Sequence, residues 1–483
     1  MLTRLQVVLF APSLLLLCLC NASARGQVEK THNSQSDGQD ARIQPLPPDT
    51  SDSGQVAPVN RSSAQRAESS TQSQPDTHVL SSGEILGLSS LNGLRRVFDP
   101  SFELSQSGQT GMVVGRILSV SSLGASVDAA KNWRRYHATV VYRGAETIYQ
   151  PSYLGLRYLP YHRFGISQEI LLDRWTLRMR DDLQYSWAAG FSGIFTGGPP
   201  QAGQSALLNG IQPTLAPNNT IETGLVRQLG DTVLAEADYA FSRRTTMTFM
   251  GSYNLLHFFS PGYIGSHDIH ERVGYNYALS AKNNVSLSYD HDRMSFDETS
   301  SRLQTDTVQI GFGRKVTGRL AFQAAVGPEL LYLYNFGPSN RRQQLSWSAF
   351  SRMAYNVRGN SYSFSYSHAA SGGSGVFVGT ETDTFTVVAT HGFKRLWSVS
   401  LNGGYAINRN LVPVASLANQ FQNWYLGSGL NRPIGRQVQF GLNYEYSEQI
   451  SGGGGCPVLS CGFPGSISQF GVTLRWHPVA TIR

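Results

Sequence analysis

The sequence is poor in charged residues, which make up only 15% of the chain, whereas soluble domains usually carry about 25%. It also has no apolar run of the roughly 20 residues that a membrane-spanning helix needs, apart from a shorter run at its start. A membrane protein of this composition would therefore cross the bilayer without helices. Glycine, tyrosine and phenylalanine are abundant instead, with 49, 22 and 23 residues, and this mixture is typical of many strands and turns.

Cysteine is scarce, and its four positions have different implications. Cys18 and Cys20 lie in the apolar part of residues 1–24, which have the layout of an export signal: Arg4, then "VVLFAPSLLLLCLC", then the small residues of "ASA". The residue before each of these cysteines is Leu rather than the small residue of a lipoprotein signal, so no lipid anchor is expected.

The other two cysteines, Cys456 and Cys461, lie in "GGGGCPVLSCGFPG". In an exported chain this spacing favours a disulfide that closes a short loop. A metal site is the alternative interpretation, but the segment has no His or acidic residue to complete one. We therefore expect no metal and no cofactor.

Aromatic residues are absent from residues 25–82, and apart from Phe10 they all lie from Phe98 onward. Residues 25–82 are rich in Ser, Gln, Asp, Pro and Thr, and such a segment cannot bury enough apolar surface to fold alone. The sequence predicts a disordered periplasmic tether over residues 25–97. Ile85, Leu88 and Leu91 stand at helical spacing and favour a short helix at residues 84–97.

From about residue 110 the sequence alternates with a period of two, as in Val438, Phe440 and Leu442 against Gln439 and Gly441. One face is apolar and aromatic, and the other carries Ser, Gly, Asn, Gln and Thr. A soluble sandwich would carry Lys and Glu on its polar face. The apolar face therefore suits lipid, and the polar face suits a water-filled interior.

Short turns alternate with longer connections, which is typical of transmembrane barrels with short periplasmic turns and longer external loops. The longer connections are expected near residues 257–268, 297–302, 333–342, 371–381, 407–420 and 449–465. The pattern predicts an all-β, up-and-down antiparallel barrel over residues 98–483. Sixteen strands are clear, and a run at 112–122 paired with a weak strand near 101–107 would make eighteen.

Charged residues fall on the polar face of several predicted strands, where they are candidate lumen charges. They could set a transverse field across a pore or form internal salt bridges. In "YDHDR", Asp290 and Asp292 share this face while His291 takes the other, so the three cannot bind one ion. The candidates are Arg178, Arg180, Asp182, Glu236, Asp238, Arg272, Asp290, Asp292, Glu329, Arg352, Glu445 and Arg475.

The segment "QFGVTLRW", residues 469–476, resembles the C-terminal insertion signal of bacterial outer-membrane β-barrel proteins. Gln469, Gly471, Leu474 and Trp476 fill the polar, glycine, apolar and aromatic places of that signal. The usual signal ends the chain, whereas "HPVATIR" follows here. The resemblance implies a porin-like barrel in the bacterial outer membrane, with membrane lipid and the barrel-assembly machinery as partners.

The long connection at residues 191–231 would be the third external loop of an eighteen-stranded barrel. In porins this loop typically folds into the pore, and a surface loop is the alternative.

We expect a channel for small hydrophilic solutes, because sixteen to eighteen strands enclose more space than side chains fill. The alternatives are a non-conducting surface barrel for adhesion or ligand binding, or uptake of apolar ligands through apolar external loops such as residues 375–379 and 411–418. No catalytic motif is present, so an enzyme is not expected. The net charge of +7 is not clustered, so nucleic acid is not an expected partner. The sequence does not indicate an oligomeric state.

Overall fold

The computed structural model describes residues 96–111, 117–153, 156–188, 220–221, 223–224, 226–297, 299–317, 319–336, 339–357, 360–393, 396–413, 418–452 and 465–478. Among these residues, no helix is both long and apolar enough to span a membrane. The proposed export signal, the tether and most of the helix proposed at 84–97 lie outside them. Arg96 and Val97, the last two residues of that helix, belong to the first strand, which begins two residues before the boundary expected at 98.

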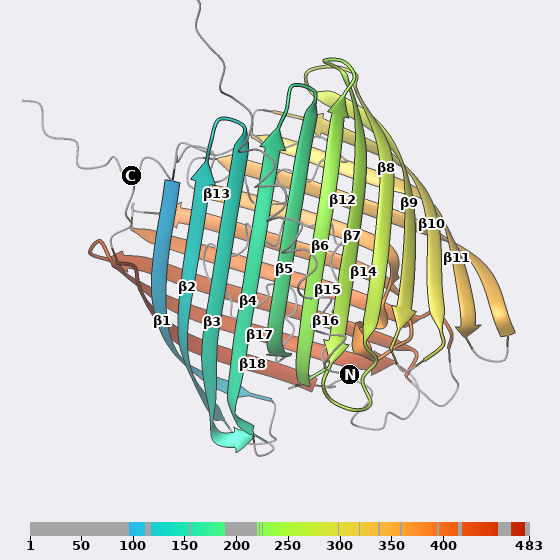
Figure 1. The fold of residues 1–483 in the computed structure, drawn as a ribbon. Helices are drawn as coiled ribbons and strands as arrows, with labels where there is room; N and C mark the ends of the chain where they lie inside the picture. Colours follow the sequence, from blue (N-terminus) through green and yellow to red (C-terminus); the bar gives the residue numbers. More distant parts are fainter. Residues whose placement is uncertain are drawn as a thin grey trace, which may run out of the picture. The chain divides into compact units, whose positions relative to one another are not determined.

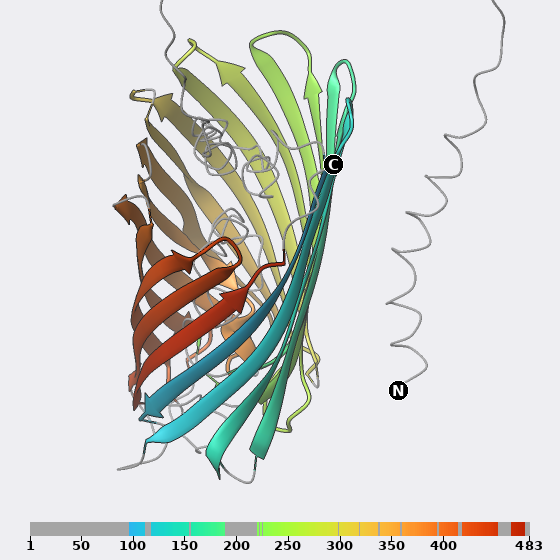
Figure 2. The ribbon, with the colours of Figure 1, turned by 90° about the vertical axis from the view of Figure 1, so that its left-hand side faces the viewer.

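The fold is a single closed sheet of eighteen antiparallel strands (Figures 1 and 2). Each strand pairs with its neighbours in sequence, and β1 also pairs with β18, which closes the barrel. The strands are β1 (Arg96–Thr110), β2 (Leu118–Asn132), β3 (Tyr136–Tyr153), β4 (Leu156–Leu171), β5 (Trp175–Ala188), β6 (Val226–Ala240), β7 (Thr245–Phe258), β8 (Ser266–Ala278), β9 (Asn283–Phe296), β10 (Arg302–Lys315), β11 (Leu320–Phe336), β12 (Ser339–Val357), β13 (Asn360–Ser371), β14 (Thr380–Phe393), β15 (Trp397–Asn410), β16 (Gln420–Ile434), β17 (Val438–Gly452) and β18 (Gly465–Trp476). The predicted up-and-down antiparallel barrel is confirmed, with the higher strand count.

The two faces of the sheet differ as the alternation predicts. Large apolar side chains remain exposed on the outer face, as Ile310 and Leu345 do with 67% and 74% of their surface accessible. Inward positions on the same strands, such as Gln309 and Ser348, are buried. Because an aqueous exterior would not favour such a surface, the apolar band is suited to the hydrocarbon core of a membrane.

The second strand was misplaced by the sequence pattern, which put it at residues 112–122. The structure has β2 at Leu118–Asn132. Its inward residues Ser122, Gly124 and Ser126 are small, and so are the outward residues Ala125 and Ala129, so the two faces differ little in hydropathy. The period of two is therefore weak where β2 lies.

One expected long loop is also absent. Near residues 333–342, β11 and β12 extend until only residues 337 and 338 separate them. Tyr332 and Tyr334 on β11 pair with Gln343 and Arg341 on β12, so residues expected in a loop continue the sheet.

Candidate functional site: the lumen and its mouth

The sequence-predicted lumen charges all lie on strands whose register places them on the inner face of the barrel. Arg178 pairs with Glu236, Asp182 with Thr232, and Arg272 with Asp290. Glu445 is the register partner of Gln469, and Arg475 lies on the same face of β18. The inner wall is therefore polar and charged. The ion pairs within it determine which parts of the wall carry excess positive or negative charge.

The strongest ion-pair network crosses β4, β5 and β6. Arg178 donates to Glu169 at 3.1 Å, and to Glu236 and Asp238 at 2.5 Å each. Arg178 has 11% of its side chain exposed, and the side chain of Glu236 is fully buried. In such surroundings each charge is stable only while its partner remains.

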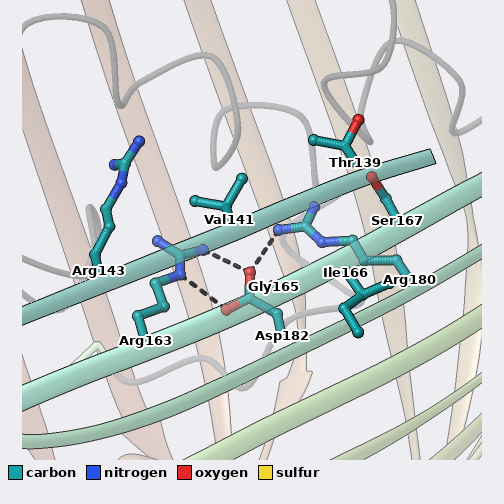
Figure 3. Close-up of a pocket in the computed structure, with 9 residues that line it drawn as sticks. All are labelled: Thr139, Val141, Arg143, Arg163, Gly165, Ile166, Ser167, Arg180 and Asp182. Carbon is teal, nitrogen blue, oxygen red and sulfur yellow. Dashed lines mark hydrogen bonds and ion pairs between the residues drawn. The ribbon is translucent and has the colours of Figure 1, made fainter. Parts of the chain in front are cut away.

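A second network lies beside it on the same wall. Asp182 accepts from Arg163 at 2.8 and 2.6 Å and from Arg180 at 2.7 Å (Figure 3). Arg143, one strand away on β3, lines the same pocket and forms an ion pair with Asp128 at 3.8 Å. The pocket thus holds three guanidinium groups and one carboxylate, Asp182, which contacts two of them, and this part of the lumen is positive.

On the wall formed by β8–β11, negative charge is in excess. Arg272 binds Asp290, and His270 binds Asp292 and lies 3.4 Å from Asp290. Two further inward carboxylates on this wall, those of Asp268 and Glu329, each have a buried oxygen without a hydrogen-bond partner in the structure. Carboxylates therefore outnumber cations on β8–β11.

The "YDHDR" segment divides between the two faces. Asp290 and Asp292 point inward, while His291 points outward and bonds to Asp306 at 2.7 Å. Among the described residues, no group of three or more His, Cys, Asp or Glu side chains could hold a metal ion.

Several lumen charges were missed by sequence reasoning. Arg163 and Glu169 share the inner face of β4 with Gly165 and Ser167, and this alternation in "RFGISQE" was the available signal. Glu103 was not predicted because the alternation of apolar and polar residues along its strand, β1, is weak. It accepts from Arg475 at 2.7 Å across the barrel seam.

The connection between β5 and β6 reaches the opposite wall of the barrel. Thr220 donates its hydroxyl to Asn408 at 2.5 Å, and its carbonyl accepts from Asn408 at 3.3 Å and from Asn423. Asn408 and Asn423 are buried on β15 and β16, which lie nine and eight strands from β6 around the closed eighteen-stranded sheet. The described end of this connection therefore lies inside the barrel, as the inward-loop alternative proposed.

The β13–β14 hairpin also folds into the mouth. Its tip contains a short 3-10 helix, η2 (Gly373–Gly375), whose Ser374 hydroxyl accepts from the Thr220 amide at 2.8 Å. Ile264, in the β7–β8 connection, donates its amide to the Gly375 carbonyl at 2.9 Å. Phe377 packs with Ile221 and Phe421. The tip thus joins three parts of the mouth.

The β13–β14 hairpin bends away from the barrel wall to reach these contacts. β12 pairs with β13 only from Ala349–His368 to Val357–Asn360, although both strands continue toward the long connections. Beyond that point β13 stays paired with β14 up to Ser371–Thr380. The apolar residues 375–379 therefore lie within the mouth, and the described residues Leu411, Val412 and Ala418 of the other apolar loop also pack inward.

The insertion-signal residues all lie on β18. Gln469 and Gly471 face inward, and Leu474 and Trp476 face outward with 45% and 44% exposure. Cys456 and Cys461 lie outside the described residues, so their disulfide stays a prediction.

A closed barrel of eighteen antiparallel strands, with an apolar outer belt and a charged inner wall narrowed by two infolded connections, defines the class of porin-like outer-membrane barrels. Among solved structures, the chain is similar to the outer membrane protein OprD from Pseudomonas aeruginosa, with 7% identity and a TM-score of 0.38 over 81% of this chain and 95% of that one. It is also similar to OccK2 (OpdF) from the same organism, with 8% identity and a TM-score of 0.42 over 80% and 98% of the two chains. Acinetobacter baumannii OccAB3 gives 11% identity and a TM-score of 0.41 over 79% and 99%. No family model matches the sequence, and no curated protein matches it either. The class therefore rests on the barrel and its two faces.

Proposed function

We propose that the protein is a channel of the bacterial outer membrane through which small hydrophilic solutes diffuse. The observation that carries this proposal is an eighteen-stranded barrel whose inner wall is polar, because barrels of this size enclose an aqueous channel. The short-turn end would face the periplasm and the end with the infolded connections would face outside, as in other barrels of this type.

The mouth would set the size limit for solutes. Thr220 and Ile221, which precede β6 along the chain, lie against β15 and β16, and the tip Gly372–Gly379 extends from β13 and β14 toward β7 and β8. A solute entering from the long-connection end would pass the opening that these two segments leave, and only then meet the charged walls.

The charged walls would orient the solute. The positive pocket of Arg143, Arg163 and Arg180 lies on β3–β5, and the carboxylate-rich wall lies on β8–β11. Solutes that carry a negative and a positive group would align with this transverse field, whereas apolar solutes would gain nothing from it.

The test is the current through the full-length protein in a planar bilayer. Discrete conductance steps are expected. Replacing Arg143, Arg163 and Arg180 together with Gln should shift the reversal potential in a salt gradient toward cation selectivity. The matched set Asp268→Asn, Asp290→Asn and Asp292→Asn should shift it the other way. Folded, inserted protein that carries no current would overturn the proposal.

A second candidate function is a non-conducting barrel for adhesion or ligand binding. The specific observation in its favour is the apolar packing in the mouth, where Leu303, Leu331 and Leu333 of the inner wall contact Val378 and Leu411–Val412 of the connections. If this apolar packing extended across the whole mouth, the mouth would be closed to solutes. Electrically silent protein would favour this candidate.

We also propose that the assembly machinery for outer-membrane barrels recognises β18. Support comes from Gln469, Gly471, Leu474 and Trp476, which lie in the final strand and at the seam of the barrel.

A further inference from the structure

The outer face of β9–β12 is layered toward the long-connection end. The first layer is apolar, with Leu287, Ile310 and Val326 in register. The next layer brings in aromatic rings at Tyr289 and Trp347, as found where a membrane meets water. The strands thus leave the hydrocarbon region near these rings.

Past the aromatic layer, one mixed layer contains His291, Asp306 and Leu345, and the same face then becomes basic. One layer contains Arg293, Gln304 and Tyr332, and the next contains Arg302, Tyr334 and Arg341. All three arginines are exposed. The Arg341 guanidinium lies over both tyrosine rings, 5.3 Å from the centroid of Tyr332 and 5.5 Å from that of Tyr334.

The three guanidinium groups are close enough to act together. Arg302 and Arg341 are two strands apart, which is about 10 Å at the usual strand spacing. Arg293 is the diagonal neighbour of Arg302 on the adjacent strand, about 7 Å away in such pairs. Arginine side chains span these separations, so the three can converge on one group.

Carboxylates on this face do not neutralise the three arginines. None of these arginines forms an ion pair within the part of the chain that the structure describes. Asp306 lies one layer closer to the apolar band and accepts from Tyr289 at 2.6 Å and His291 at 2.7 Å, and Glu271 lies in that same layer. Asp297, just past the end of β9, lies 3.4 Å from His257 and 3.9 Å from His267 and forms no ion pair with these arginines. The two layers that hold the arginines therefore carry net positive charge.

The opposite side of the barrel does not share this feature. The outward positions near the same end of β16 and β17 carry Gln420, Gln422 and Glu448. Two other described arginines lie outward near this end, Arg227 over the rings of Trp187 and Phe259 and Arg409 in an ion pair with Asp383, and neither belongs to a cluster of three.

We propose that Arg293, Arg302 and Arg341 form a binding site for the phosphate headgroup of a membrane lipid in the leaflet at the long-connection end. Guanidinium groups bind phosphate oxygens through paired, charge-assisted hydrogen bonds. The acyl chains of the lipid would lie along Ile310, Leu345 and Trp347, which are exposed directly below. The site depends on the membrane location of the barrel and not on conduction, so a silent barrel would still bind the lipid.

The test is native mass spectrometry of the full-length protein in detergent, titrated with lipid A, which carries two phosphates, and separately with phosphatidylcholine. We expect lipid A to be retained in preference to phosphatidylcholine. In the variant R293Q/R302Q/R341Q, lipid A affinity should fall at least about tenfold, since each charge-assisted contact contributes on that order. The matched control R243Q/R244Q/R319Q removes three exposed arginines at the short-turn end and should retain lipid A as wild type does.

Further arms separate the possible outcomes. Millimolar inorganic phosphate should not displace lipid A, because the acyl chains contribute to binding; displacement would show a simple anion site and overturn the lipid proposal. Equal retention in all variants, or equal loss in both triple variants, would also overturn it. The variant R293K/R302K/R341K keeps the charge and should bind with intermediate affinity, which tests the proposal even if the glutamine variant does not fold.

Discussion

Phe102 of β1 and Trp476 of β18 are register partners whose rings stack on the outer face, with centroids 5.7 Å apart and planes inclined by 22°. The next residues, Glu103 and Arg475, form an ion pair on the inner face. The seam that closes the barrel is therefore fixed on both faces, by an aromatic contact toward lipid and by a salt bridge toward the lumen.

Trp476→Ser should leave most of the chain unassembled and sensitive to protease. The change removes both the aromatic residue of the proposed insertion signal and the stack on Phe102. Heat-modifiable mobility on gels measures the assembled fraction. Trp424→Ser is the matched control, because Trp424 also faces outward and contacts Tyr446, with centroids 4.9 Å apart, but lies away from the seam. Normal assembly of the Trp476 variant would refute the prediction.

Arg178→Met should destabilise the barrel by about 3–5 kcal/mol, because Glu169, Glu236 and Asp238 would lose their shared cation. The measurement is the urea concentration at half unfolding in detergent. Arg352→Met removes an inward arginine for which no ion pair is found among the described residues, and should change the midpoint much less. Equal effects of the two substitutions would show that the network adds no stability.

Gly375→Ala should displace the infolded hairpin and enlarge or destabilise the conductance steps. A Cβ at Gly375 would clash with the ring of Phe258, and its φ of 81° adds backbone strain. Gly435→Ala is the control, since Gly435 has a φ of 72° in a short turn and no atom within 4 Å of the added Cβ. This pair separates the clash from the strain. Unchanged conductance in the Gly375 variant would show that the hairpin does not narrow the pore.

An epitope tag inserted after Pro261 should be reachable on intact cells, whereas one inserted after Ser242 should not. Pro261 is exposed in the β7–β8 connection, and Ser242 is exposed in the short β6–β7 turn. Antibody binding to intact and permeabilised cells gives the comparison. Gly373 is buried, so a tag there would not report on topology. The reverse labelling pattern would invert the proposed orientation.

The sequence predicted the barrel because lipid and water select opposite residues on the two faces of a strand. That selection is strong at Tyr289 and Ile310, and it disappears at β2, where Ala125 and Ser126 fit either face. Strand position therefore failed where small residues occupy both sides.

The lumen charges were predictable from the same alternation, but their partners were not. Which arginine meets Asp182 depends on register between strands, and a one-residue shift would have moved Arg163 to the lipid face. The infolded hairpin was not predictable either, because "GGSGVFVG" has the composition of a surface loop. Its apolar residues find their contacts in segments as distant in sequence as Ile221 and Phe421.

The closing pair β1–β18 has a consequence for how the chain folds. Every other strand pairing joins neighbours in sequence, so those hairpins can form one after another with local contacts. Glu103 and Arg475 are separated by 372 residues. For an unstructured chain, closing a loop of that length would cost about 5 kcal/mol in chain entropy. Until it closes, the sheet has two unpaired edges that can join with other chains. The protein should therefore be most prone to aggregation at its last folding step, and a catalyst that holds β1 and β18 together would accelerate folding more than one acting on any single hairpin.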